Sequence, residues 1–104
     1  MRINIFDCRD CSAEEIIELM ITLNPELNDP VKRRKVYVGV TGNIRERLLR
    51  HNVDVALFSA QTANRMVAKK VENIAYKMGF NIGNVSWGGN GTNSHSIYVY
   101  ACLL

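Results

Sequence analysis

Few cysteines, few prolines and no long apolar run characterise this sequence. Its 104 residues include three cysteines, two prolines and one tryptophan. Three cysteines cannot all pair within one chain, which excludes a fully paired disulfide framework for a monomer and favours a reducing compartment. No apolar run approaches the roughly 20 residues that a bilayer-spanning helix needs, and the N-terminal residues lack the apolar stretch of a signal peptide. We therefore expect an intracellular, cytoplasmic protein without a membrane segment.

The remaining composition is that of a globular protein. Apolar residues make up 47% of the chain and charged residues 22%, which excludes disorder over the whole length. A chain of this size has room for one hydrophobic core. We therefore expect a single domain over residues 1–104.

Two of the cysteines lie close together in sequence. Cys8 and Cys11 have the Cys-x-x-Cys spacing of a redox pair or of half a zinc site, whereas Cys102 lies in an apolar C-terminal segment. The chain lacks a second Cys-x-x-Cys pair, and the spacing of His51 and His95 fits no zinc finger. We interpret the three cysteines as free structural thiols, with a redox pair and a zinc site as the alternatives.

Hydrophobic periodicity and capping signals predict alternating strands and helices. Ser12 with Glu15 three residues later is a capping-box signature for a helix that ends before the first proline, at Asn24. Asn43 is a plausible N-cap for a second helix, and Thr62 is predicted to cap a third that runs to residue 78, before Gly79. Strands are predicted over residues 2–7, 36–41, 53–58 and 96–104, and loops over 24–35 and 83–95. The order βαβα(β)αβ indicates an α/β fold.

Positive charge is concentrated in one region of the chain. The formal net charge is only +3, but seven basic residues lie close together: Lys32, Arg33, Arg34, Lys35, Arg45, Arg47 and Arg50. Clustered Lys and Arg side chains attract phosphate backbones and gain affinity by releasing counterions. We expect the first four, with Arg45 and Arg50, to bind nucleic acid. The alternative is a solvated loop followed by a solvated helix face.

Residues 36–51 resemble the second half of the GIY-YIG nuclease signature. In that family a strand ending in Tyr-(Ile/Val)-Gly leads through a short turn into a helix. The helix carries an Arg ten residues after the Tyr and often a His four residues further on. Tyr37, Gly39, Arg47 and His51 occupy those positions here. Glu72, in the later predicted helix, resembles the glutamate with which the family binds its metal ion.

The resemblance implies both a fold and an activity. The implied fold is a small, mainly antiparallel sheet of three to four strands flanked by helices. The implied activity is hydrolysis of phosphodiester bonds in DNA by an endonuclease that uses one Mg²⁺ or Mn²⁺ ion. Tyr37 would act as the base, with its pKa lowered by nearby cations or metal-bound groups. Arg47 would grip the phosphoryl oxygens, His51 would assist, and Glu72 would bind the metal.

The first motif of that signature, Gly-Ile-Tyr, is absent from the sequence. The nearest candidate strand, Asn4-Ile5-Phe6, carries a phenylalanine and is separated from Tyr37 by a whole predicted helix. The family's downstream asparagine has three candidates here, Asn81, Asn84 and Asn90. The alternative function is therefore a catalytically degenerate module that binds nucleic acid or a protein. Specific cutting would need recognition by loops, by a homodimer or by a targeting partner.

Overall fold

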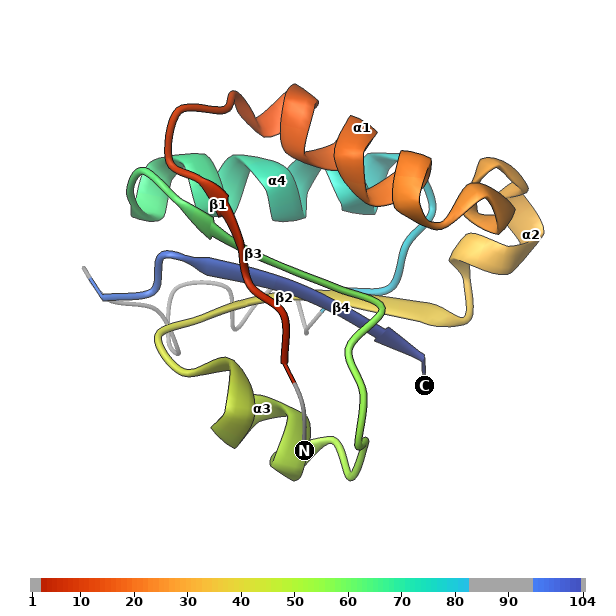
Figure 1. The fold of residues 1–104 in the computed structure, drawn as a ribbon. Helices are drawn as coiled ribbons and strands as arrows, with labels where there is room; N and C mark the ends of the chain where they lie inside the picture. The colour runs from red at the N-terminus through yellow and green to blue at the C-terminus, as the bar shows by residue number, and fades with distance from the viewer. Residues whose placement is uncertain (1–2, 83–94, 104) are drawn as a thin grey trace.

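The computed structural model describes residues 3–82 and 95–103 (Figure 1). Four strands, four α-helices and one 3₁₀ helix are formed by these residues. In chain order they are β1 (Phe6–Cys8), α1 (Ala13–Leu23), the 3₁₀ helix η1 (Pro25–Asn28), α2 (Pro30–Arg33), β2 (Val36–Thr41), α3 (Ile44–Arg50), β3 (Phe58–Thr62), α4 (Arg65–Lys77) and β4 (Tyr98–Leu103).

The strands form one mixed sheet in the order β1-β3-β4-β2. β1 pairs parallel with β3, whereas β4 pairs antiparallel with both β3 and β2. The expected α/β class with a small, mainly antiparallel sheet is thus confirmed at the level of a four-stranded mixed sheet flanked by helices. The strand next to β2 is β4, from the other end of the chain, and not β1.

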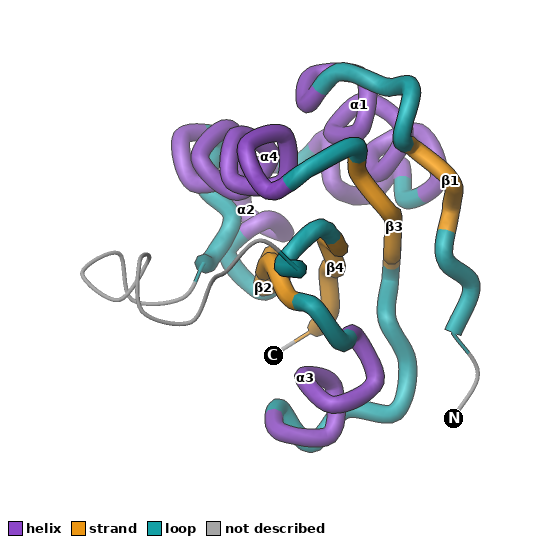
Figure 2. Tube along the Cα trace, turned by 90° about the vertical axis from the view of Figure 1, so that its left-hand side faces the viewer, coloured by secondary structure: helices purple, strands orange, loops and turns teal. Residues whose placement is uncertain are grey.

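Helices cover both faces of the sheet. α1 and α4 lie side by side on one face, and α3 lies on the other (Figures 1 and 2). Because successive side chains of a strand point to opposite faces, β2 divides its residues between two clusters. Val36, Val38 and Val40 belong to the larger core under α1 and α4, while Tyr37 packs against the smaller cluster under α3.

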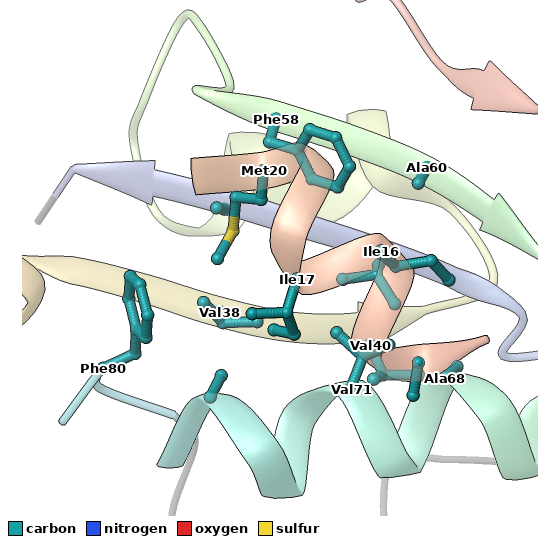
Figure 3. Close-up of a cluster of buried hydrophobic side chains, with 14 of the residues drawn as sticks. Ile16, Ile17, Met20, Val38, Val40, Phe58, Ala60, Ala68, Val71 and Phe80 are labelled. Carbon is teal, nitrogen blue, oxygen red and sulfur yellow. The ribbon is translucent and has the colours of Figure 1, made fainter. Parts of the chain in front are cut away.

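The larger core holds most of the buried apolar side chains. Figure 3 shows Ile16, Ile17 and Met20 of α1 and Val71 of α4 gathered with side chains of the sheet, and all four are at most 5% exposed. Burial of each such side chain stabilises the fold by about 1.5–3 kcal/mol. The smaller cluster, the α3 cluster, contains Ile44, Leu48, Tyr100 and Cys102. It places α3 directly over β2 and β4.

Local capping signals are formed largely as predicted. Ser12 Oγ accepts a hydrogen bond from the Glu15 N–H at 3.1 Å, and a Glu15 carboxylate oxygen accepts one from the Ser12 N–H at 2.8 Å. Asn43 caps α3 by accepting from the Glu46 N–H. Gly79 has φ of +98°, a left-handed conformation that favours glycine because it has no Cβ.

Several sequence-based boundaries were wrong. The first strand covers Phe6–Cys8 and not 2–7, because among the described residues before Cys8 only Phe6 and Asp7 pair with β3 as well. Residues 24–35, predicted as a loop, form η1 and α2, because each proline occupies a first helical turn, where its missing N–H costs nothing. The third strand covers Phe58–Thr62 and not 53–58, because its pairing partner is β4. Asn64 and not Thr62 caps α4, because the Thr62 hydroxyl donates to the carbonyl oxygen of Ile97 at 2.7 Å. The predicted loop over 83–95 lies, except for His95, outside the described residues.

None of the helices within residues 3–82 and 95–103 combines the length and the apolar character that crossing a bilayer requires.

Candidate functional site

β2, the turn after it and α3 form one continuous unit that positions three of the predicted site residues. Tyr37 projects from β2 toward the face covered by α3. Arg47 lies in the last turn of α3, and His51 is the C-cap residue that ends it. Residues four apart lie on the same side of a helix. The four-residue spacing of Arg47 and His51, which suggested the site in the sequence, therefore also brings these two side chains to one side of α3.

Tyr37, His51 and Tyr100 form an aromatic cluster on this face. The ring centroids of Tyr37 and His51 are 4.5 Å apart, and those of Tyr37 and Tyr100 are 5.9 Å apart. His51 Nε2 is hydrogen-bonded to the Tyr100 hydroxyl at 3.0 Å. Tyr100 was not among the predicted site residues. It comes from β4, the antiparallel neighbour of β2, whereas the strand expected to precede the motif, β1, pairs with β3.

Gly39 makes the space that Tyr100 fills. The two residues are direct partners across the β2–β4 ladder. A Cβ built on Gly39 would lie 2.7 Å from the Cζ and hydroxyl oxygen of Tyr100, which is too short for the contact of a methyl carbon with either atom. A glycine inside a buried strand indicates close approach of another group. The glycine within the predicted strand could therefore have indicated a bulky neighbour at Gly39, but it could not have identified that neighbour as Tyr100.

Arg47 and Glu72 both act electrostatically on Tyr37. Burial raises the pKa of Tyr37 above its ordinary value, and the Glu72 carboxylate raises it further. A hydrogen bond with Tyr100 and the Arg47 guanidinium lower the same pKa, but burial dominates. The Tyr37 phenol is therefore affected by one cation, the Arg47 guanidinium, and by one anion, the Glu72 carboxylate. The structure contradicts the expectation of a lowered Tyr37 pKa, because partial burial outweighs the single cation nearby.

Glu72 reaches this region from α4, on the face of the sheet opposite α3 (Figure 2). β2 is an edge strand and contacts α4, which lets a residue of that helix act on Tyr37. Glu72 Oε1 accepts from Lys69 Nζ at 3.1 Å, and only 16% of the Glu72 side chain is exposed. The carboxylate is thus partly covered and already has one cationic partner.

The donor set around Glu72 restricts which metal ion the chain can hold. Among residues 3–82 and 95–103, no group of three or more His, Cys, Asp or Glu side chains gathers as a metal site, which is a poor match for the closed coordination that zinc takes in structural sites. Magnesium needs only one or two protein carboxylates and keeps several waters. One carboxylate at Glu72 fits that requirement, provided that the ion displaces Lys69 from Oε1.

Burial keeps the other two members of the aromatic cluster uncharged. Burial, and then the Arg47 guanidinium, lower the pKa of His51 below its ordinary value of 6.5. Burial strongly raises the pKa of Tyr100, which is 1% exposed. At neutral pH His51 is therefore a neutral imidazole able to accept a proton, and Tyr100 is a protonated phenol. Tyr100 is too deeply buried to reach a substrate and serves to hold His51 in place.

The structure divides the predicted basic surface. Lys32, Arg34 and Lys35 are exposed around α2, as are Arg45 and Arg50 on α3, where Arg50 pairs with Glu46 at 2.7 Å. Arg33 differs from the others. Its Nε donates to the carbonyl oxygen of Leu27 at 2.7 Å, and its Nη1 donates to that of Met78 at 3.2 Å. The guanidinium also lies over the Phe80 ring at 5.8 Å. Through these contacts Arg33 joins α2 to the end of α4, so its guanidinium is already engaged within the protein.

Of the three candidate asparagines, Asn81 lies beside β2. Its backbone N–H donates to the carbonyl oxygen of Val36, and its carbonyl oxygen accepts from the Val38 N–H, on either side of Tyr37. Its side-chain amide donates to the carbonyl oxygen of Arg34. Asn81 therefore pairs with the free edge of β2 through its backbone. Asn84 and Asn90 lie outside the described residues.

Acidification from about pH 7.5 to about pH 5.5 is expected to lower the free energy of unfolding through His51. The unfolded chain protonates this residue near the ordinary value of 6.5, whereas the folded chain does so only at lower pH. Below that value the unfolded state binds more protons, so stability falls as pH falls. Urea denaturation at the two pH values measures the change. His51→Asn should flatten this dependence on pH; an equal loss of stability on acidification in His51→Asn would contradict the assignment.

The chain was also compared with known proteins. No protein-family model, no curated protein and no solved structure matches it.

Proposed function

We propose that the chain is a metal-dependent endonuclease that hydrolyses phosphodiester bonds in DNA, of the GIY-YIG type that residues 36–51 resemble. One observation carries the proposal: the Tyr37 ring lies against the His51 ring at a tilt, and the charges of both Arg47 and Glu72 affect the Tyr37 phenol. A phenol, an imidazole and a guanidinium from one short segment and a carboxylate from a later helix therefore act on one region. Phosphodiester hydrolysis needs these groups together, since a water must lose a proton while negative charge grows on the phosphate.

The protonation states suggest how the roles are divided. Arg47, with its planar fork of donors, holds two oxygens of the scissile phosphate. Tyr37 remains protonated because its pKa is raised, so its hydroxyl donates a hydrogen bond to the phosphate. The neutral His51 imidazole takes the proton of the attacking water. Glu72 would hold the Mg²⁺ or Mn²⁺ ion, which would supply Lewis-acid stabilisation of the phosphate charge.

The aromatic cluster also supports the resemblance where the sequence departs from it. The missing first motif would have contributed a tyrosine from a strand ahead of Tyr37. Here Tyr100 lies beside Tyr37 from β4, a strand that follows the predicted site residues in the chain. We infer that Tyr100 is the second tyrosine of the site and that it acts by positioning His51.

A second candidate function is the degenerate module that binds nucleic acid without cutting it. The ion pair between Lys69 and Glu72 favours this function, because it occupies an oxygen that the metal ion needs. The raised pKa of Tyr37 favours it as well. In such a module Arg47 would still hold a phosphate, and the exposed Lys32, Arg34 and Lys35 would add sequence-independent affinity.

A plasmid-nicking assay separates the two functions. With Mg²⁺ or Mn²⁺ the chain should convert supercoiled plasmid to the nicked form, and EDTA should abolish the conversion. Glu72→Gln, which removes the charge but keeps the shape, should lower the rate at least about a hundredfold. Glu14→Gln is the matched control, because Glu14 also pairs with a lysine, Lys70, but has no part in the site.

Two results would count against the proposed metal site. Nicking that is untouched by EDTA, or equal nicking by Glu72→Gln and the unmodified chain, would remove Glu72 from the site. Salt-sensitive DNA binding without nicking in any metal would instead support the binding module.

A further inference from the structure

Cys8 and Cys11 are held together by a tight turn far from the site described above. Cys8 ends β1, and Cys11 immediately precedes Ser12, the N-cap of α1. The Cys11 N–H donates to the carbonyl oxygen of Cys8 at 3.1 Å, so the four residues close a β-turn. The first and last Cα atoms of such a turn lie within about 7 Å, and disulfides bridge Cα separations of about 4.4–6.8 Å. The backbone therefore already has the spacing of a disulfide.

The two thiols differ in exposure but lie next to each other. Cys8 is 1% exposed, whereas Cys11 is partly exposed. Burial, and then the neighbouring Cys11 thiol, raise the pKa of Cys8 to about 11. The Cys11 thiol therefore lies close enough to Cys8 to act on it electrostatically, as the turn between the two residues requires. Cys102 belongs to the α3 cluster on the other face of the sheet and provides an internal control.

We propose that Cys8 and Cys11 form a dithiol that is reversibly oxidised to an intramolecular disulfide by small disulfides of the glutathione class. The partly exposed Cys11, as thiolate, attacks one sulfur of oxidised glutathione. The S–S bond between the two glutathione units breaks, and one reduced glutathione molecule leaves. Cys8 then gives up its proton and attacks the Cys11 sulfur, which releases the second reduced molecule. Two protein thiols are oxidised, one small disulfide is reduced to two thiols, and the two protons end on those thiols.

The raised pKa of Cys8 slows the exchange in both directions. A scarce thiolate makes the second attack slow at neutral pH, since the thiolate is the attacking species. The same basicity makes Cys8 a poor leaving group when the protein disulfide is attacked. The disulfide is therefore formed slowly and reduced slowly. The alternative use of the pair, as half of a zinc site, lacks further ligands among the residues that the structure describes.

The test uses the full chain with oxidised glutathione as the probe, incubated at about pH 8 to equilibrium and then acid-quenched and alkylated. Intact mass should show loss of two hydrogens, about 2 Da, with two reduced glutathione molecules released per chain. Peptide mapping should place the bridge between Cys8 and Cys11 and find Cys102 alkylated after unfolding. A persistent glutathione adduct on Cys11, or both thiols still reduced, would overturn the proposal.

Two variants separate the steps of the reaction. Cys8→Ser should stop at a stable glutathione adduct on Cys11. Cys11→Ser should leave Cys8 reacting at least about tenfold more slowly than the pair does, because Cys8 is buried. If the buried substitution prevents folding, the unmodified chain and Cys11→Ser decide the question. Rapid reaction of Cys8 in Cys11→Ser would contradict the proposed order of attack.

Discussion

Arg47→Ala should lower the rate of plasmid nicking at least about a hundredfold. The guanidinium is the cation that affects the pKa of all three members of the aromatic cluster, and it acts on each from α3. Its loss would remove both the grip on the phosphate and the charge beside the neutral imidazole. Initial rates of nicking at saturating and at low plasmid concentration measure the effect on kcat and on KM.

Arg45→Ala is the matched control for this variant. Arg45 lies on the same helix and carries the same charge, but it is exposed and has no resolved influence on the aromatic cluster. An NMR titration gives a second readout that does not depend on activity. Because Arg47 lowers the pKa of His51, Arg47→Ala should raise it, and Arg45→Ala should leave it unchanged. If the two substitutions have equal effects on nicking and on the His51 titration, Arg47 has no specific role in the site and is only one of several charges on a solvated helix face.

Gly39→Ala should destabilise the fold by about 3 kcal/mol, a large effect for the addition of one methyl group. The new Cβ would lie 2.7 Å from the Tyr100 ring, which is buried and hydrogen-bonded to His51 and so has no room to withdraw. Either β2 and β4 separate or the ring leaves the aromatic cluster. Urea denaturation gives the change in unfolding free energy, and nicking by the folded fraction reports the second effect.

A double-mutant cycle with Tyr100→Ala identifies the cause of that loss. In the Tyr100→Ala background the ring is absent, so Gly39→Ala should cost well under about 1 kcal/mol. Gly79→Ala is a useful comparison, because Gly79 has φ of +98° and no atom within 4 Å of a built Cβ. Its cost, about 1–2 kcal/mol, reflects backbone conformation alone. If Gly39→Ala costs the same with and without the Tyr100 ring, the packing argument fails.

Features that depend on a few adjacent residues could be predicted from the sequence. The capping box at Ser12, the cap at Asn43 and the left-handed Gly79 each need only groups three or four positions apart. The β-branched run that forms β2 and the apolar stripe of α1 are likewise local patterns. The same locality explains why the turn between β2 and α3 was recognised before the fold was known.

Features that depend on pairing between distant segments could not be predicted from the sequence. The third strand starts at Phe58 because β4 is its partner, although residues 53–57 have a similar apolar pattern. The contact between Tyr37 and Tyr100 joins segments more than sixty residues apart, and the sequence gives no register for β2 and β4. The burial that raises the pKa of Tyr37 depends on the same packing. A pKa predicted from charged neighbours alone therefore had the wrong direction.

By itself, the sequence determined the α/β class, the starts of α1 and α3, and the spacing that brings Arg47 and His51 to one side of α3. Tertiary structure alone decided the strand order, the position of Tyr100 over Gly39, and the reach of Glu72 toward Tyr37 from the other face of the sheet. The physical reason is the range of the interactions. Caps and helix faces are set within one or two turns, whereas strand neighbours are chosen by burial across the whole chain.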